Sequence, residues 1–208
     1  MKIAVLTSPD QWFIPYAEKL VYDLPNAKLF CEHESIDKSF DLVLILSYHR
    51  IITQKYLSLH KHNIVIHASD LPKGKGWSPM FWQIVEGKNE IPFSMFEADQ
   101  GIDSGNIYLK KFMQLNGYEL NKELRDKQAK FIINMCIDFI NNYDAYKNAT
   151  PQESEESQYS KRTPENSKLD INKTINEQFN LLRIVDNDEY PAFFYLDKKK
   201  YVIKIYEG

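Results

Sequence analysis

The sequence has 208 residues, of which 43% are hydrophobic and 26% charged, the balance of an ordinary globular protein with a sizeable core. The 26 basic and 29 acidic residues give a net charge of −3, and no basic block interleaved with aromatic residues occurs, so nucleic-acid binding has no electrostatic support. The two cysteines, Cys31 and Cys136, are far apart and lack CxxC spacing. That usage argues against a disulfide framework and a structural zinc site, and it favours a reducing compartment.

The first residues predict a buried strand at Lys2–Leu6 rather than a secretion signal, because the apolar run is too short. No stretch approaches the roughly 20 apolar residues that a bilayer span requires. We therefore expect a cytoplasmic protein with no membrane partner.

Short apolar runs and one amphipathic stretch alternate over the first third of the chain. Phe13, Tyr16, Ala17, Leu20 and Val21 recur at helical spacing after the turn residues Ser8-Pro9-Asp10. The runs that predict strands are Lys2–Leu6, Lys28–Phe30, Leu42–Leu46 and Asn63–Ala68. Strand, helix, strand, helix, strand is the order of a doubly wound α/β fold with a mostly parallel sheet.

The pattern changes in the second half of the chain. The expected elements are a helix over 79–87, strands over 93–98 and 107–115, a long helix over 119–142, a helix over 170–184, and a terminal hairpin of 193–196 and 201–205. Residues 147–161 are polar and rich in Ser, Glu and Gln, which is typical of an exposed linker or loop. We therefore divide the chain into a main domain (1–146), a linker (147–161) and a small C-terminal helix plus β-hairpin extension (162–208).

Three common ligand motifs are missing. The loop after the first strand is TSPDQ, without a GxGxxG fingerprint, and neither a GxxxxGK[ST] loop nor an HExxH pair occurs. The sequence thus predicts neither a dinucleotide site nor a metal site.

The segment from Val65 to Ile107 concentrates the remaining candidates. His67 comes at the carboxyl end of a predicted parallel strand, which is where open α/β sheets form their ligand crevice. Asp103 follows in a loop with glycines at 101 and 105, and such a loop can approach a neighbouring strand end. Each residue alone is more often structural, the histidine as a hydrogen-bonded side chain and the aspartate as a turn former. The pair in this order predicts an acid–base site.

This segment resembles the folate-dependent formyltransferases, whose signature is Asn-x-His-x-Ser-x-Leu-Pro, a glycine, a proline followed closely by a tryptophan, and a loop Asp-x-Gly-x-Ile. The matching residues are His67, Ser69, Leu71, Pro72, Gly76, Pro79, Trp82, Asp103, Gly105 and Ile107. Residues 161–170 (KRTPENSKLD) are similar to a stretch that follows the family's catalytic domain. The resemblance implies a Rossmann-like α/β fold and transfer of a formyl group from 10-formyltetrahydrofolate to an amine.

By this resemblance, His67 and Asp103 are the catalytic residues. Asp103 would hold His67 in its cationic form, His67 would stabilise the oxyanion, and Asp103 would take the ammonium proton, directly or through a water. One position departs from the signature: Val65 stands where the family has Asn, and valine cannot donate a hydrogen bond. Either another donor serves, such as a backbone N–H or Ser69, or the chain is a non-catalytic folate-binding relative.

The resemblance also assigns two binding regions. The loop that leaves the central strand would contact the folate through Ser47, Tyr48, His49, Arg50, Ile51 and Ile52. The acceptor would meet Ser8, Asp10, Gln11, Trp12, Ser69, Lys73, Lys75, Gly76 and Trp77. Lys73 and Lys75 are the residues we expect to face a diphosphate, although two lysines beside glycines also suit a solvated loop.

The sequence HASDLPKGKGWSP resembles that of the branch that formylates nucleotide-linked amino sugars, so we expect such a small-molecule acceptor, in surface glycan biosynthesis. Glycinamide ribonucleotide is an alternative acceptor that fits the length of the chain but not the sequence of this segment. Methionyl-tRNA fits less well, since that enzyme carries an RNA-binding barrel and only about 45 residues follow Arg162 here. Hydrolysis of formyl-folate is a third alternative. An exposed hairpin edge invites strand addition, so the C-terminal hairpin further predicts a homodimer.

Overall fold

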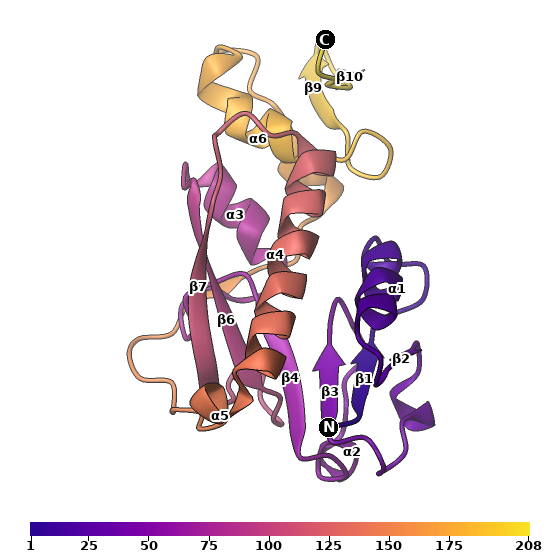
Figure 1. The fold of residues 1–208 in the computed structure, drawn as a ribbon. Coiled ribbons are helices and arrows are strands. Elements are labelled where there is room, and N and C mark those ends of the chain that lie inside the picture. The colour runs from indigo at the N-terminus through magenta and orange to yellow at the C-terminus, as the bar shows by residue number, and fades with distance from the viewer.

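The computed structural model describes residues 1–208, and its centre is a six-stranded sheet in the order β2-β1-β3-β4-β6-β7 (Figure 1). The strands are β1 (Ile3–Leu6), β2 (Ala27–Phe30), β3 (Leu42–Ile45), β4 (His62–His67), β6 (Glu90–Glu97) and β7 (Ile107–Gln114). The first four run parallel, whereas β6 and β7 are antiparallel to their neighbours. The predicted α/β fold with a mostly parallel sheet is therefore confirmed.

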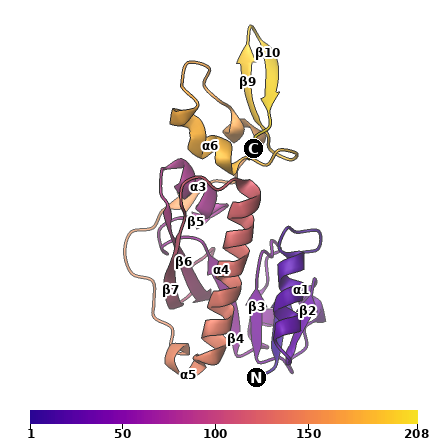
Figure 2. The same cartoon turned by 45° about the horizontal axis from the view of Figure 1, so that its top comes forward.

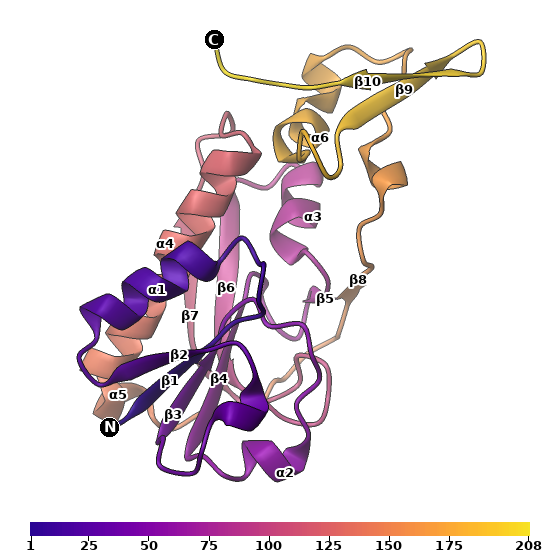
Figure 3. The ribbon, with the colours of Figure 1, turned by 90° about the vertical axis from the view of Figure 1, so that its right-hand side faces the viewer.

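Both faces of the sheet are covered, which explains why β1 and β3 are continuously apolar and fully buried. On one face, helices α1 (Ile14–Asp23) and α4 (Asn121–Asn141) pack on a cluster that includes Val5 and Leu44 (Figure 3). On the other face, Ala4 and Val43 belong to a smaller cluster beneath the short helix α2 (Gln54–Leu57) and the 3₁₀ turn η1 (His33–Ser35). The crossovers after β2 and β3 thus contain only single turns of helix.

The middle of the chain adds helix α3 (Pro79–Val85), the short helix α5 (Tyr143–Tyr146) and a two-stranded ladder of β5 (Lys75–Gly76) with β8 (Gln158–Tyr159). The chain then continues through the 3₁₀ turns η2 (Pro164–Ser167) and η3 (Asn176–Gln178) to helix α6 (Phe179–Ile184). Strands β9 (Ala192–Leu196) and β10 (Lys199–Ile203) form a terminal hairpin that projects from the body of the molecule (Figure 2). No helix combines the length and the hydropathy that crossing a bilayer would take.

The predicted hairpin is present, with its second strand starting two residues earlier than expected, but the predicted helix over 170–184 is wrong in its first half. Residues 171–175 form turns, because the side chain of Asp170 accepts the backbone N–H of Asn172. The amide of Gln178 also donates to the carbonyl oxygens of Asp170 and Lys173. Such side-chain bonds compete with helical ones, and the helix starts only at Phe179.

A buried ion pair ties helix α6 to the main sheet. The Arg183 side chain is fully buried, and its Nη1 lies 3.3 Å from Oε2 of Glu119, whose side chain is 1% exposed. Arg183 also donates to Oδ1 of Asn89 at 2.7 Å. The C-terminal segment is thereby fixed above the start of α4 and the carboxyl edge of the sheet.

Candidate active site

His67 and Asp103 lie side by side at the carboxyl end of β4. Nε2 of His67 is 3.6 Å from Oδ2 of Asp103, and the two side chains are only 11% and 16% exposed. His67 Nε2 also lies 2.9 Å from the carbonyl oxygen of Gly74, which can only accept, so this nitrogen carries the hydrogen. Oδ2 of Asp103 accepts the N–H of Gly76 at 2.8 Å. The loop 74–76 therefore contacts both side chains and orients them toward each other.

The loop between β6 and β7 brings Asp103 to this position. Asp103 has φ +50°, a left-handed conformation that Asp tolerates better than most residues. A side chain on Gly105 would place its Cβ 1.7 Å from the carbonyl oxygen of Glu97, so the backbone can pass there only as glycine. Ser104 donates to Oδ1 of Asp99 at 2.6 Å and closes the other side of the loop.

A strap formed by residues 150–159 crosses both loops. The side-chain amide of Gln152 donates to the carbonyl oxygens of Asp103 and Gly105, each at 2.8 Å. Ser157 accepts the N–H of Gly74 through its hydroxyl and the N–H of Lys75 through its carbonyl, both at 2.9 Å. The polar segment that the sequence marks as a linker or loop is thus hydrogen-bonded to the backbone on which His67 and Asp103 depend.

The contact between strap and loop leaves no room for a side chain at position 76. A Cβ on Gly76, which has φ +94°, would lie 2.5 Å from the carbonyl oxygen of Tyr159. Tyr159 stacks on Trp82 and donates its hydroxyl to Glu86 on the turn after α3. The strap is in this way anchored to α3 as well as to the two loops.

The predicted folate loop leaves β3 at the same edge of the sheet. Ser47 has φ +53°, and the N–H of His49 donates to Oγ of Ser8 at 3.1 Å, which joins this loop to the one after β1. The Tyr48 hydroxyl lies 2.8 Å from Nδ1 of His33, and Arg50 forms ion pairs with Glu32 and Glu34. Ile51 is 91% exposed, so an apolar side chain stands free at this edge.

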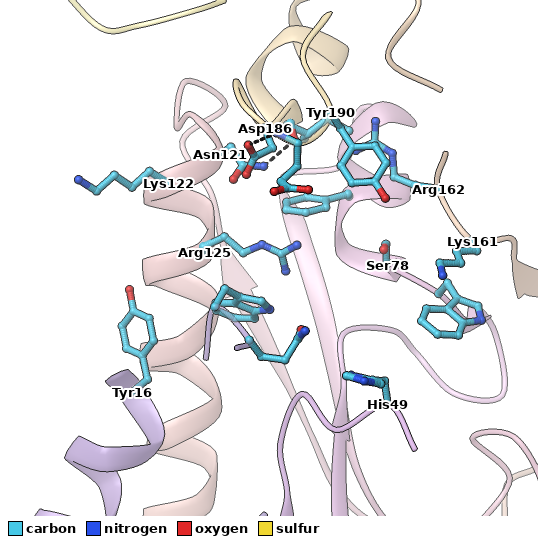
Figure 4. Close-up of a pocket in the computed structure, with 16 residues that line it drawn as sticks. Tyr16, His49, Ser78, Asn121, Lys122, Arg125, Lys161, Arg162, Asp186 and Tyr190 are labelled. Carbon is cyan, nitrogen blue, oxygen red and sulfur yellow. Dashed lines mark hydrogen bonds between the residues drawn. The ribbon is translucent and has the colours of Figure 1, made fainter. Parts of the chain in front are cut away.

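A cavity of about 790 Å³ opens beside the pair, between the carboxyl edge of the sheet, the start of α4 and the C-terminal segment (Figure 4). Of the residues predicted to bind folate or acceptor, four line it: Gln11, Trp12, His49 and Trp77. Its volume is that of an ordinary small-molecule site. Trp77 directly follows Gly76, whose N–H binds Asp103, so the loop that holds Asp103 also forms part of the cavity wall.

The other predicted acceptor residues lie outside this lining. Lys75 is buried, and its ammonium is 2.7 Å from Oε1 of Glu156 on the strap. Lys73 and Asp10 are exposed. Ser69 is buried and its hydroxyl has no hydrogen-bond partner.

Val65 occupies the position two residues before His67 on β4. It pairs with Ile45 and Phe96 in the sheet, and its side chain packs on the apolar groups around Leu71. Asn63 cannot act in its place, because its amide donates to the carbonyl of Leu57 at 2.8 Å and lies 3.3 Å from Glu97. No side-chain amide therefore stands where the family's signature has one.

Two arginines and one glutamine lie at the site but were not among the residues predicted from the sequence. Arg125 and Arg162 line the cavity, and Gln152 holds the Asp103 loop. Arg125 belongs to the long helix, whose stripe of apolar residues signals core packing only. Arg162 stands in the KRTPENSKLD stretch, whose resemblance to the family was the one available signal. No three His, Cys, Asp or Glu side chains are grouped so that they could hold a metal ion.

Comparison with known proteins relates the chain to one family. The family described as "Formyl transferase" matches residues 31–138, just over half of the chain. Methionyl-tRNA formyltransferase of Alkaliphilus oremlandii is 30% identical over 148 residues, which are 69% of this chain and 47% of that protein. The chain thus spans about half the length of this relative.

Two solved structures share the fold. A 4-N formyltransferase from Francisella tularensis superposes with a TM-score of 0.74 at 17% identity, covering 98% of this chain and 97% of the other. HypX from Aquifex aeolicus in complex with tetrahydrofolic acid has a TM-score of 0.78 at 14% identity, covering 99% of this chain and 37% of HypX. Together with the matched residues, which include His67 and Asp103, these comparisons show that the chain belongs to the formyl transferase family.

Proposed function

We propose that the protein transfers a formyl group from 10-formyltetrahydrofolate to the amine of a nucleotide-linked amino sugar. The observation that carries the proposal is the 3.6 Å approach of His67 to Asp103 at the carboxyl edge of the sheet. Membership of the family supports the formyl donor, and the HypX complex with tetrahydrofolic acid is a fold relative that binds a reduced folate. The sugar acceptor rests on the sequence of residues 67–79 and on sugar N-formyltransferases among the proteins of the same fold.

The chemistry follows from the two side chains. The neutral amine attacks the formyl carbon, and its lone pair forms the new C–N bond while the carbonyl electrons move to oxygen. A hydrogen bond from His67 stabilises that oxyanion, and Asp103 takes the proton from the ammonium nitrogen. The oxyanion then collapses, the bond to N10 of the folate breaks, and N10 takes a proton. The products are the N-formyl sugar and tetrahydrofolate.

Because Val65 cannot donate a hydrogen bond, the site lacks the side-chain amide that would help to stabilise the oxyanion. Removing one preorganised donor costs a typical enzyme about 10²–10³ in kcat. We propose that His67 is the main side-chain donor here and that a backbone N–H replaces the amide. A protein that binds folate without turnover would be the outcome if no such replacement exists.

Methionyl-tRNA is a second candidate acceptor, because the relative from A. oremlandii bears that name. The net charge of −3 speaks against a nucleic-acid acceptor, since binding to a phosphate backbone relies on basic residues. Both acceptors use the same catalytic pair, so the acceptor must be tested separately from the chemistry.

The test is ultraviolet absorbance of 10-formyltetrahydrofolate mixed with the protein and a panel of nucleotide-linked 4-amino sugars, glycinamide ribonucleotide or methionyl-tRNA. We expect loss of the formyl donor that depends on one of the sugars and stops in the His67→Asn variant. Loss without any amine would indicate a hydrolase. Turnover with methionyl-tRNA alone would replace the sugar, and no turnover on a broad panel would contradict the enzyme.

A further inference from the structure

Arg125 lies between two aromatic rings in the cavity beside the catalytic pair. Its Cζ is 4.5 Å from the ring centroid of Trp12 and 4.4 Å from that of Phe81. Figure 4 shows the guanidinium extending from α4 into the open space of the pocket. Burial lowers the pKa of Arg125 to about 10, so the group stays cationic at neutral pH.

Most hydrogen-bond donors of this guanidinium are unused. Its one side-chain hydrogen bond goes to Oε1 of Gln128, at 3.3 Å on the same helix. The charge of Asp186 raises the pKa of Arg125, but no carboxylate lies within ion-pair distance of the guanidinium. A guanidinium has five N–H donors and cannot give up its charge at neutral pH. A partly buried cation without an ion pair is costly to desolvate, so a ligand that brings negative charge is favoured at this position.

Arg162 faces the same cavity from the opposite wall and is similarly unsatisfied (Figure 4). Its Nε is buried and has no hydrogen-bond partner. Its Nη2 makes only two long contacts, of 3.5 Å each, to the backbone of Asn166 and the hydroxyl of Ser167. The charge on Arg162 lowers the pKa of Arg125 further, as expected for two cations that line one cavity.

The charge of the cavity is opposite to that of the whole protein. Lys122, Arg125, Lys161 and Arg162 face it, against the acids Asp186 and Glu189, on a chain whose net charge is −3. Oδ1 of Asp186 accepts the backbone N–H groups of Asp188 and Glu189, and the charge of Asp186 raises the pKa of Arg125 without forming an ion pair with it. None of the four basic side chains forms an ion pair, so the cavity carries an excess of unpaired positive charge.

We propose that Arg125 and Arg162 bind a phosphate oxyanion of the formyl acceptor. Planar forks of N–H donors suit phosphate oxygens, and two of them with Lys161 match a group that carries more than one negative charge. The identity of the molecule that bears the phosphate rests on the proposed formyl transfer, whereas the oxyanion site itself does not. The role moves from Lys73 and Lys75, where the sequence suggested it, to a different wall of the site, in keeping with the pairing of Lys75 to Glu156.

The position of the site suits an acceptor that spans both regions. Trp77 lines the cavity and is joined through Gly76 to the carboxylate of Asp103. A phosphate held between Arg125 and Arg162 leaves the remainder of the acceptor directed toward His67 and Asp103. The exposed ring of Trp77 offers a flat surface on the way.

The experiment is isothermal titration calorimetry of the full chain with inorganic pyrophosphate, and with malonate as a carboxylate of comparable size. We expect pyrophosphate to bind more tightly than malonate, and Arg125→Gln and Arg162→Gln each to weaken pyrophosphate binding about tenfold or more. Arg125→Lys retains the charge but lacks the fork, so it should also bind more weakly. Lys173→Gln removes one exposed charge outside the cavity and should bind as the parent does.

Three outcomes overturn the proposal: no binding of pyrophosphate by the parent protein, binding by Arg125→Gln that equals the parent, or a preference for malonate. Thermal unfolding followed by circular dichroism, together with tetrahydrofolate binding, confirms that each variant is folded. Because pyrophosphate binding requires no turnover, the site stands if the variants lose pyrophosphate and no acceptor is formylated. In that case only the proposed function fails.

Discussion

The side-chain amide of Gln152 donates a hydrogen bond of 2.8 Å to the backbone carbonyl of Asp103, across 49 residues of sequence. The same nitrogen holds the carbonyl of Gly105 at 2.8 Å. One residue of the strap thus fixes the backbone on both sides of Ser104, and with it the carboxylate that faces His67.

Replacing Gln152 with alanine should therefore lower kcat while leaving the KM for 10-formyltetrahydrofolate unchanged. A misplacement of about 1 Å can cost up to about 10²-fold in rate, and we expect a loss of about tenfold or more. Steady-state kinetics on the identified acceptor provide the measurement. Glu153→Ala is the matched control, since Glu153 is an exposed neighbour on the strap without a side-chain hydrogen bond. Equal kinetics in both variants would show that the strap does not position Asp103.

His67→Asn and Asp103→Asn should each lower kcat by about 10²–10⁴, the usual contribution of a positioned acid or base. Both changes keep a polar side chain of similar size, so tetrahydrofolate should still bind with an unchanged Kd by calorimetry. Single-turnover rates separate the chemical step from binding. Unchanged turnover in both variants would remove the pair from the mechanism.

Breaking the buried ion pair between Arg183 and Glu119 should destabilise the protein strongly. Arg183→Met removes the buried cation while Lys127 remains paired with Glu119, so we expect a cost of about 1–3 kcal/mol in the free energy of unfolding, the usual value for a lost hydrogen bond to a charged group. Urea denaturation measures the change. As a control, Lys204→Met breaks the exposed pair with Asp188 and should leave the free energy of unfolding nearly unchanged. Similar losses in the two variants would contradict a special role for the buried pair.

The same carboxylate predicts an acid limit to stability. Burial alone would raise the pKa of Glu119, but hydrogen bonds from Lys127 and from the backbone N–H of Asn116 lower the pKa below its ordinary value. A depressed pKa in the folded state means that the stabilisation is complete above the unfolded value of about 4.3 and is lost as the pH falls through the lower, folded value. The free energy of unfolding should therefore decrease below about pH 4, and Glu119→Gln should show a shallower decrease in urea titrations at several pH values. Identical slopes for the two proteins would rule out this contribution.

Much of the fold can be predicted from local hydrophobic patterns in the sequence. The buried runs that became β1 and β3, and the apolar stripe of α4, follow from period and composition alone, because a strand covered on both faces must be continuously apolar. The helix expected from Asp170 failed because side-chain hydrogen bonds of Asp170 and Gln178 satisfy backbone groups that a helix would use. Such side-chain hydrogen bonds leave no periodic pattern in the sequence, so the sequence alone does not reveal them.

The candidate site could likewise be predicted only in part. His67 and Asp103 could be named because a strand end and a glycine-flanked loop converge at one edge of a sheet. Arg125 could not, since its surroundings depend on Trp12 and Phe81, which approach from distant elements. The ion pair of Lys75 with Glu156 was equally hidden, because the strap reaches the loop only in three dimensions.

The closeness of Gly76 to the carbonyl of Tyr159 limits how this chain can be divided. A protease cut between Gln152 and Tyr159, or an engineered boundary there, would divide the strap. The strap would then no longer hold the loop 74–76 and the Asp103 loop in place. A fragment ending near residue 146 would keep His67 and Asp103 in its sequence, yet lack the atoms that hold their backbone in place. Complementation by the missing peptide, added in trans, would then depend on its re-forming the short β5–β8 ladder.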